Sequence, residues 1–277
     1  MEMFLYGFMQ RAFQASFLIS LIAPILGLFL ILRRQTLMAD TLSHVSLAGV
    51  ALGLLIGTNP TLTNIIVVAL VAVILEYLRK VYRTYSEISI AMLMSGGMAV
   101  ALVLMGLNDT GATVSIQQFL FGSIVTISTD QVWMLLIVTL LIITLYLIFR
   151  KPMYILTFDE ETAFTSGLPI WLMSILFNVL TGVTIALVMP IVGALLVAAI
   201  LVLPAAVSIR LSKSFNGVIL IGILVSLVGM FSGLTASYYL GTPPGASITL
   251  VFILLFGLTG LALKLTKQSK RNAFLRK

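Results

Sequence analysis

Residues 12–32 read Ala-Phe-Gln-Ala-Ser-Phe-Leu-Ile-Ser-Leu-Ile-Ala-Pro-Ile-Leu-Gly-Leu-Phe-Leu-Ile-Leu, an uncharged and mainly apolar block that stops at Arg33-Arg34. A helix of about 20 residues crosses the roughly 30 Å hydrocarbon core of a bilayer. The block does not alternate between apolar and polar residues, so a helix is favoured over a strand of a membrane barrel. Because lipid offers the backbone no hydrogen bonds, the block predicts a transmembrane helix.

The composition of the whole chain agrees with this reading. Of 277 residues, 60% are hydrophobic and only 9% are charged, against about 25% charged in soluble domains. The net charge of +7 is typical of basic cytoplasmic loops. We see no basic patch with groove-reading or aromatic elements, so no nucleic-acid partner is expected. The absence of cysteine excludes disulfides and thiolate chemistry. No Gly-x-x-x-x-Gly-Lys-Ser/Thr motif is present, so ATP hydrolysis of that type is not expected in this chain.

The apolar blocks predict an all-α polytopic membrane protein with a single transmembrane domain over residues 1–277. We expect about nine transmembrane helices, at residues 12–32, 37–56, 62–78, 88–107, 132–149, 170–187, 192–209, 218–239 and 247–265. Turn sequences such as Gly57–Pro60 and Gly241–Gly245 separate them. The break at Met189-Pro190 is the weakest boundary, and a broken or re-entrant segment there would leave eight spans. The apolar piece 117–126 is too short to span and is expected at the interface.

The basic residues predict the orientation of the chain in the membrane. Lys or Arg follows the first, third, fifth, seventh and ninth blocks, whereas the other four loops carry neither. Because Lys and Arg collect on the cytoplasmic side, the N-terminus is expected outside and the C-terminus inside. The N-terminus lacks a charged region followed by a small-residue cleavage site, so we expect no cleaved signal peptide.

Asp40 and His44 are the candidate site residues inside the membrane. His44 is the only histidine and lies in the second span, with Asp40 four residues before it, so the two side chains share one helix face. Ionisable residues inside a span are costly and indicate function. Carboxylate and imidazole are ligands for zinc or manganese.

Three interpretations of this pair remain open from the residues alone. The pair is a metal site, a structural hydrogen-bond pair between helices, or a proton relay of a stand-alone secondary transporter. Two ligands do not complete a site of about four. The nearby hydroxyls of Thr41, Ser43 and Ser46 are better explained by interhelical hydrogen bonds than by metal ligation. One His and one Asp do not form a full catalytic set, so an enzyme is disfavoured.

The polar stretch Phe158–Pro169 is a second candidate region. Its acids, Asp159, Glu160 and Glu161, suit the positive end of a helix dipole, and Gly167 is suited to ending that helix. A short cytoplasmic helix would be a docking element for a soluble partner. An ordinary polar loop is the alternative.

These residues carry a resemblance to a known family. Residues 32–53, Leu-Arg-Arg-Gln-Thr-Leu-Met-Ala-Asp-Thr-Leu-Ser-His-Val-Ser-Leu-Ala-Gly-Val-Ala-Leu-Gly, closely resemble a signature of the permease subunits of bacterial zinc and manganese ABC importers. Residues 158–169 are similar to their coupling segment, and residues 193–206 to a further typical segment. The family motif often has glycine before the acid, where this chain has Ala39. This small-for-small change leaves the Asp–His pair intact.

The resemblance implies a permease of the type II ABC importer fold in the bacterial plasma membrane. It implies two permease copies, cytoplasmic ATPase subunits, an extracytoplasmic metal-binding protein, and Zn²⁺ or Mn²⁺ as transported ion with no permanently bound cofactor. Asp40 and His44 would then contact the metal, and residues 33–34 and 43–49 resemble the zinc branch of the family more closely than the manganese branch. Contact with the ATPase would involve a set within the coupling segment: Asp159, Glu160, Glu161, Ala163 and Gly167.

Overall fold

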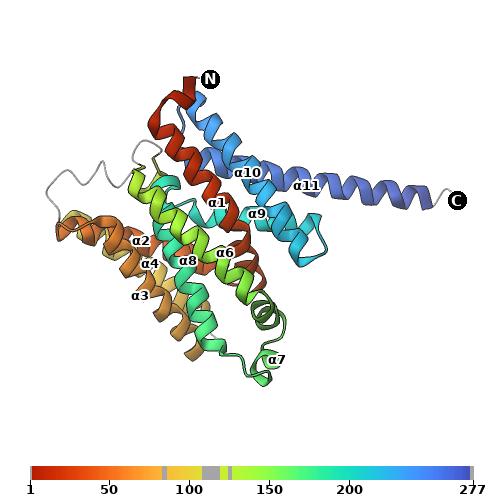
Figure 1. Ribbon diagram of the computed structural model, residues 1–277, viewed down its shortest axis with the longest axis horizontal. Coiled ribbons are helices and arrows are strands. Elements are labelled where there is room, and N and C mark those ends of the chain that lie inside the picture. The colour runs from red at the N-terminus through yellow and green to blue at the C-terminus, as the bar shows by residue number, and fades with distance from the viewer. Residues whose placement is uncertain (1, 83–85, 108–118, 124–126, 275–277) are drawn as a thin grey trace.

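The computed structural model describes residues 2–82, 86–107, 119–123 and 127–274, and every regular element in these ranges is a helix (Figure 1). The elements are η1 Glu2–Leu5, α1 Gly7–Leu32, α2 Thr36–Leu55, α3 Pro60–Val81, α4 Ser86–Gly106, α6 Thr129–Phe158, α7 Glu160–Thr165, α8 Ile170–Val192, α9 Val197–Leu211, α10 Phe215–Leu240 and α11 Pro244–Phe274. The turn expected after residue 107 lies outside the described residues.

Within the described ranges, eight helices are long and apolar enough to cross a membrane. The predicted all-helical membrane fold is therefore confirmed. Counted by length, these helices match the eight-span alternative, because the seventh predicted span corresponds to α9, which is shorter than the other eight. This helix has only 15 residues, or about 22 Å of rise.

The break expected at Met189-Pro190 lies three residues later. Helix α8 continues through Pro190 to Val192, and the chain turns at Gly193, where φ is +96°. Proline has no N–H and so leaves a helix carbonyl one turn earlier without its donor. The buried Asn64 of α3 fills this role, since its Nδ2 donates to the Ala186 carbonyl at 3.1 Å. A side chain on a neighbouring helix thus lets α8 pass its proline without breaking.

Residues 119–123 pack against the turn between α8 and α9. The amide of Ala194 donates to the Phe119 carbonyl at 2.8 Å, and Ser123 N–H donates to the Pro190 carbonyl at 3.2 Å. Gly122 and Gly193 touch back to back, and a Cβ on either would lie within 2.7 Å of the other segment's backbone. Non-helical backbone inside a membrane protein needs such internal partners. The rest of the predicted interfacial piece falls outside the described residues.

Local signals in the sequence set the other helix ends. Asn59 caps α3, its Oδ1 accepting from Thr61 N–H at 3.0 Å, with Pro60 in the first helical turn. Ser128 and Gln131 form a capping box at the start of α6. Gly241 ends α10 in the left-handed conformation, which glycine adopts without a steric penalty.

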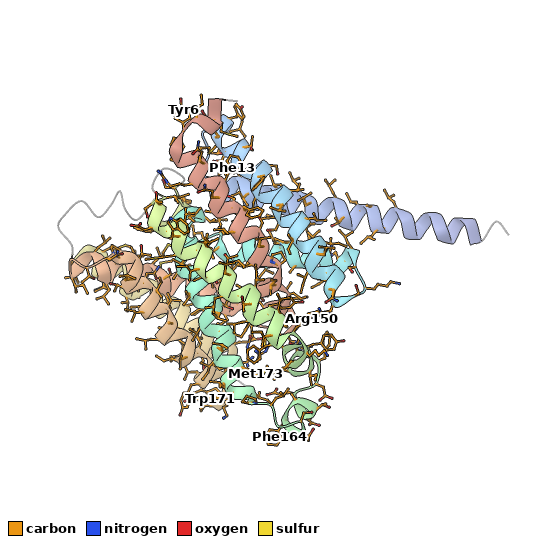
Figure 2. All side chains as sticks on the ribbon, viewed as in Figure 1. Tyr6, Phe13, Arg150, Phe164, Trp171 and Met173 are labelled. Carbon is orange, nitrogen blue, oxygen red and sulfur yellow. The ribbon has the colours of Figure 1, made fainter. Side chains whose placement is uncertain are left out.

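The helices pack as two groups joined through α6 and α8 (Figure 1). Helices α2, α3 and α4 form one group, and α1, α9, α10 and α11 form the other. Helix α1 is buried along most of its length, and its Phe13 meets Phe231 of α10 edge to face at 5.3 Å (Figure 2). Helix α8 packs against α2, α3 and α6, so it links the candidate site on α2 to the cytoplasmic segment that precedes α8.

The substitution Gly27→Ala is expected to destabilise the α1–α9 contact. A Cβ on Gly27 would lie 2.1 Å from the Leu201 carbonyl oxygen, so the two backbones must separate. Overpacking of this kind costs about 1–3 kcal/mol. The measurement is the thermal unfolding midpoint of the purified protein.

Gly96→Ala is the matched control, because a Cβ on Gly96 meets nothing within 4 Å. Alanine is also favoured over glycine in a helix. Equal unfolding midpoints for the Gly27 and Gly96 variants would contradict the close packing of α1 on α9.

Candidate metal site and its surroundings

Helix α2 carries Asp40 and His44 on successive turns of one face. Asp40 Oδ1 and His44 Nε2 are 3.9 Å apart, which is too long for a hydrogen bond. Two ligands of one tetrahedral zinc ion, each bonded at about 2.0–2.1 Å, lie about 3.3 Å apart. A small side-chain adjustment would bring both atoms onto one ion.

The side of α2 that carries Asp40 and His44 is partly exposed at one end when the chain is considered by itself. The side chain of Asp40 is 37% exposed and that of His44 is 12% exposed. Leu37, on the turn before, is exposed, whereas Leu47, on the turn after, is buried. The pair is therefore accessible from the end of α2 that follows Arg33-Arg34.

The polar atoms around the pair divide into partnered and unpartnered groups. Thr41 Oγ1 donates to the Leu37 carbonyl at 3.0 Å, and Ser43 Oγ donates to the Asp40 carbonyl at 2.7 Å. Thr41 also reaches the Ile90 carbonyl of α4 at 3.5 Å. Of these three hydrogen bonds, the contact between Thr41 and Ile90 joins two helices, as predicted, whereas the other two stay within α2. Ser46 Oγ and His44 Nδ1 are buried and have no hydrogen-bond partner among the residues that the structure describes.

Among the described residues, no third His, Cys, Asp or Glu side chain joins Asp40 and His44. Across the residues that the structure describes, no cluster of three or more His, Cys, Asp or Glu side chains is close enough to hold one ion. A site of about four ligands therefore needs groups of another kind, such as hydroxyls, carbonyls or water, or groups from outside the described part of the chain.

An ion pair with a buried carboxylate and a partly exposed guanidinium lies near the C-terminal end of α3. Glu76 is 5% exposed, and its Oε1 accepts from Arg79 Nη2 at 2.9 Å. Glu76 and Arg79 are three residues apart, a spacing that places two side chains on the same side of a helix. The other oxygen, Oε2, accepts from Asn178 Nδ2 of α8 at 2.6 Å. With its amide oxygen turned toward α3, Gln35 also accepts from the Arg79 guanidinium.

Arg33 extends this polar cluster from α1 to α8. Its Nη2 donates to Ser174 Oγ at 2.6 Å, and its guanidinium lies 5.9 Å from the Phe177 ring centroid. Burial, and secondly the Arg79 charge, lowers the pKa of Arg33 to about 10, so the group stays charged at neutral pH. Glu76 and Glu160 shift this pKa upward, which places α7 within electrostatic reach of the cluster.

Sequence reasoning missed Asn178 and Ser174 as members of this cluster. The sequence did carry a signal, the side-chain amide of Asn178 within the apolar block 170–187. A polar side chain inside a membrane protein needs a hydrogen-bond partner. The partner itself could not be identified, since Glu76 is 102 residues away in the chain.

The stretch 158–169 forms a short helix, α7, as the acids and glycine suggested. Asp159 caps it, with Oδ1 accepting from Thr162 N–H at 2.9 Å. The hydrogen bond from the Thr162 hydroxyl is the main cause that lowers the pKa of Asp159. Gly167 follows the helix with φ +75°. Ala163 is fully buried against Leu156 of α6 and Met173 of α8.

The outer face of α7 is turned away from the helix bundle. Glu160 and Glu161 are exposed, and Phe164 is 74% exposed at the tip of the molecule in Figure 2. An exposed aromatic beside acids is suited to a protein contact. Sequence reasoning named the acids and Ala163 but not Phe164, because only the fold shows which side of α7 is covered.

Long apolar helices with an ionisable Asp–His pair among them are typical of membrane transport proteins. The family model described as the ABC 3 transport family matches residues 5–262. The chain belongs to this family, as the signature at residues 32–53 indicated, and it is a permease of the metal-transporting ABC type.

Three named relatives align with nearly the whole length of this chain. A probable metal transport system membrane protein of Treponema pallidum is 36% identical over 251 residues, covering 90% of this chain and 92% of the relative. The manganese transport system membrane protein MntC of Halalkalibacterium halodurans is 28% identical, covering 91% and 86%. The high-affinity zinc uptake system membrane protein ZnuB of Buchnera aphidicola is 27% identical, covering 85% and 90%.

A solved structure supports the same fold. PsaBC from Streptococcus pneumoniae, determined in complex with Fab, superposes with a TM-score of 0.82 at 28% identity, covering 92% of this chain and 91% of that chain. The match extends over almost all of both chains, so the helix arrangement described above is that of an ABC importer permease.

Proposed function

We propose that this chain is the membrane-spanning subunit of an ATP-driven importer of a divalent transition metal, with zinc as the ion and manganese as the alternative. The observation that carries the proposal is the intramembrane Asp40–His44 pair, whose facing atoms are 3.9 Å apart on an accessible helix face. In this proposal all 277 residues form one transmembrane domain, and no cofactor is permanently bound.

A second copy of the chain would complete the pathway. A charged Asp40 that is 37% exposed is costly against lipid, so it needs a polar or protein cover. Two copies facing each other would contribute two carboxylates and two imidazoles, which is the four-ligand set that zinc prefers. Such a site would hold the ion transiently, because conduction needs sites weak enough to release it.

Zinc is placed before manganese for two reasons. Imidazole is a ligand suited to zinc, whereas manganese favours oxygen ligands. The sequence of residues 33–34 and 43–49 also resembles the zinc branch of the family more closely than the manganese branch. The relatives named above include both a zinc and a manganese system, so the choice between the two ions rests on the ligand chemistry and on this sequence resemblance.

Helix α7 would transmit the ATPase cycle to the membrane helices. Cytoplasmic ATPase subunits would contact Asp159, Glu160, Glu161 and Phe164, while Ala163 fixes α7 to α6 and α8 and Gly167 allows the tight turn into α8. Because α8 packs on α2, a movement of α7 has a direct mechanical route to Asp40 and His44. An extracytoplasmic metal-binding protein would deliver the ion to the opposite face.

The proposed location is the bacterial plasma membrane, with the N-terminus outside and the C-terminus in the cytoplasm. Lys or Arg follows α1, α3, α9 and the apolar part of α6, which are the ends expected in the cytoplasm. The start of α10 lies beside the same end of α6, so α9 would cross the membrane as a short ninth pass.

The test is reconstitution of the chain into liposomes with and without its ATPase partner. Accumulation of labelled zinc that requires the ATPase, ATP and the metal-binding protein is the expected result. Transport by the chain alone, driven by a proton gradient, would instead establish the secondary-transporter alternative. Accumulation of labelled manganese but not zinc would reassign the ion.

Phe164→Ala is expected to weaken ATPase binding roughly tenfold or more, since exposed aromatic anchors commonly contribute about 2 kcal/mol at interfaces. The measurement is co-purification of the ATPase with the tagged permease at increasing salt. Phe17→Ala, which removes an exposed aromatic from α1, is the control. Equal ATPase retention in the two variants would argue against α7 as the docking element.

A further inference from the structure

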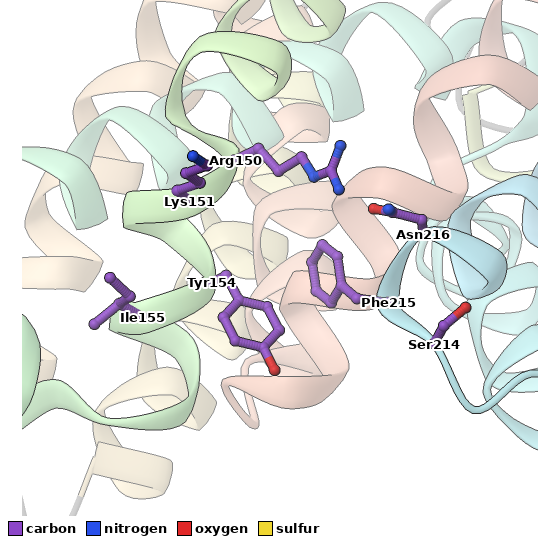
Figure 3. Close-up of a pocket in the computed structure, with 7 residues that line it drawn as sticks. All are labelled: Arg150, Lys151, Tyr154, Ile155, Ser214, Phe215 and Asn216. Carbon is purple, nitrogen blue, oxygen red and sulfur yellow. The ribbon is translucent and has the colours of Figure 1, made fainter.

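A pocket of about 390 Å³ lies between the end of α6 and the start of α10 (Figure 3). Arg150 extends from α6 across this pocket toward Asn216 of α10, over the rings of Tyr154 and Phe215 (Figure 3). The two rings meet edge to face at 5.3 Å and form an apolar floor. The first turn of α10, capped by Ser214, points its positive dipole end toward the pocket.

Two cations that are unpaired in the described part of the chain line the pocket. Arg150 and Lys151 both line it, and neither makes an ion pair or a hydrogen bond with any residue in the described part of the chain. Adjacent cations repel each other, and both are favoured by a bound anion. A planar guanidinium is well suited to a phosphate group.

The position of the pocket along α6 corresponds to the headgroup layer of a membrane. Arg150 is 21 residues beyond Thr129, the first residue of α6, which corresponds to about 32 Å of helix rise. This distance is close to the roughly 30 Å thickness of the hydrocarbon core. The two cations therefore lie where phospholipid phosphates of one leaflet are found.

Two strips of exposed apolar side chains lead from the membrane to the pocket. On α6, Leu140 and Leu147 lie above Lys151 on the same helix face, and both are exposed. On α10, Leu220 and Leu224 follow Asn216 in steps of four residues and are also exposed. A cationic pocket at the foot of two apolar strips matches an amphipathic ligand better than a soluble anion.

We propose that the α6–α10 pocket binds the phosphodiester headgroup of an anionic membrane phospholipid through Arg150 and Lys151, with the acyl chains lying along the exposed strips of α6 and α10. The site is separate from the Asp40–His44 pair and does not depend on which metal is carried. Basic pockets between transmembrane helices favour anionic headgroups.

The experiment is lipid binding to the purified full-length chain, measured by native mass spectrometry in detergent. Phosphatidylglycerol is compared with phosphatidylcholine of the same acyl chains. A loss of roughly fivefold in affinity is expected for each removed cation, or about 30-fold for Arg150→Gln with Lys151→Gln. The exchange Arg150→Lys with Lys151→Arg keeps both charges and should retain binding, which separates charge loss from misfolding.

The control is Lys80→Gln with Lys264→Gln, which removes two exposed cations, one from the last turn of α3 and one from within α11, and should leave binding unchanged. Equal binding of both lipids, or equal loss in the pocket and control variants, would overturn the proposal. Soluble glycerol phosphate binding as tightly as phosphatidylglycerol would indicate a free-anion site instead. Loss of ATPase co-purification in the pocket variant with lipid binding intact would assign this face to the ATPase.

Discussion

Metal uptake is expected to fall at least about tenfold to 100-fold in cells carrying Asp40→Ala or His44→Ala, since loss of even an outer-shell partner of a metal site costs that much. The two side chains face each other across 3.9 Å and no third ligand of the described chain stands near them. Removing either one leaves a single ligand per chain, which cannot hold the ion. The measurement is uptake of labelled zinc and manganese with the ATPase and binding-protein partners present.

Leu37→Ala is the matched control for this prediction. Leu37 is exposed and lies one turn from Asp40 on the same face of α2, but it has no ligand atom. The control should keep uptake close to that of the unmodified chain, and all variants must be inserted in the membrane and bound to the ATPase. Undiminished uptake in both the Asp40 and His44 variants would mean that the pair is structural and that the ion passes elsewhere.

Replacing Glu76 by leucine is expected to destabilise the protein by up to about 3 kcal/mol, the lower end of the cost of removing one partner of a buried ion pair, because the side chain of Arg79 is 30% exposed to solvent. The change leaves Arg79 without its 2.9 Å partner and Asn178 without its 2.6 Å acceptor. The Arg33 charge also loses a favourable neighbour. The loss should appear as a lower thermal unfolding midpoint and a lower yield of folded protein.

Glu87→Leu is the control for the loss of a carboxylate, because Glu87 is exposed in the first turn of α4. Asn178→Leu should reproduce part of the Glu76 effect, since it removes one of the two hydrogen-bond partners of that carboxylate. If Glu76→Leu unfolds at the same temperature as Glu87→Leu, the cluster contributes little and its role lies outside stability.

The candidate site could be predicted in part because its main spacing is local. Asp40 and His44 are four residues apart, and one helix turn suffices to bring them together. The helix at Glu160–Thr165 was also local, since its acids, Ala163 and Gly167 are within nine residues. By contrast, the Glu76–Asn178 and Arg33–Ser174 contacts join residues more than 100 positions apart, and no spacing in the sequence indicates such pairs.

The sequence by itself determined that the chain is an all-helical membrane protein, and it placed most spans within a few residues of their observed bounds. This was possible because length and continuous hydrophobicity are the properties that a bilayer selects. Only the tertiary structure decided that α8 passes through Pro190 and turns at Gly193, because the freed Ala186 carbonyl is satisfied by Asn64 from another helix. It also decided which face of α2 stays open and where α6 and α10 leave a pocket, since both depend on how helices distant in the chain pack against one another.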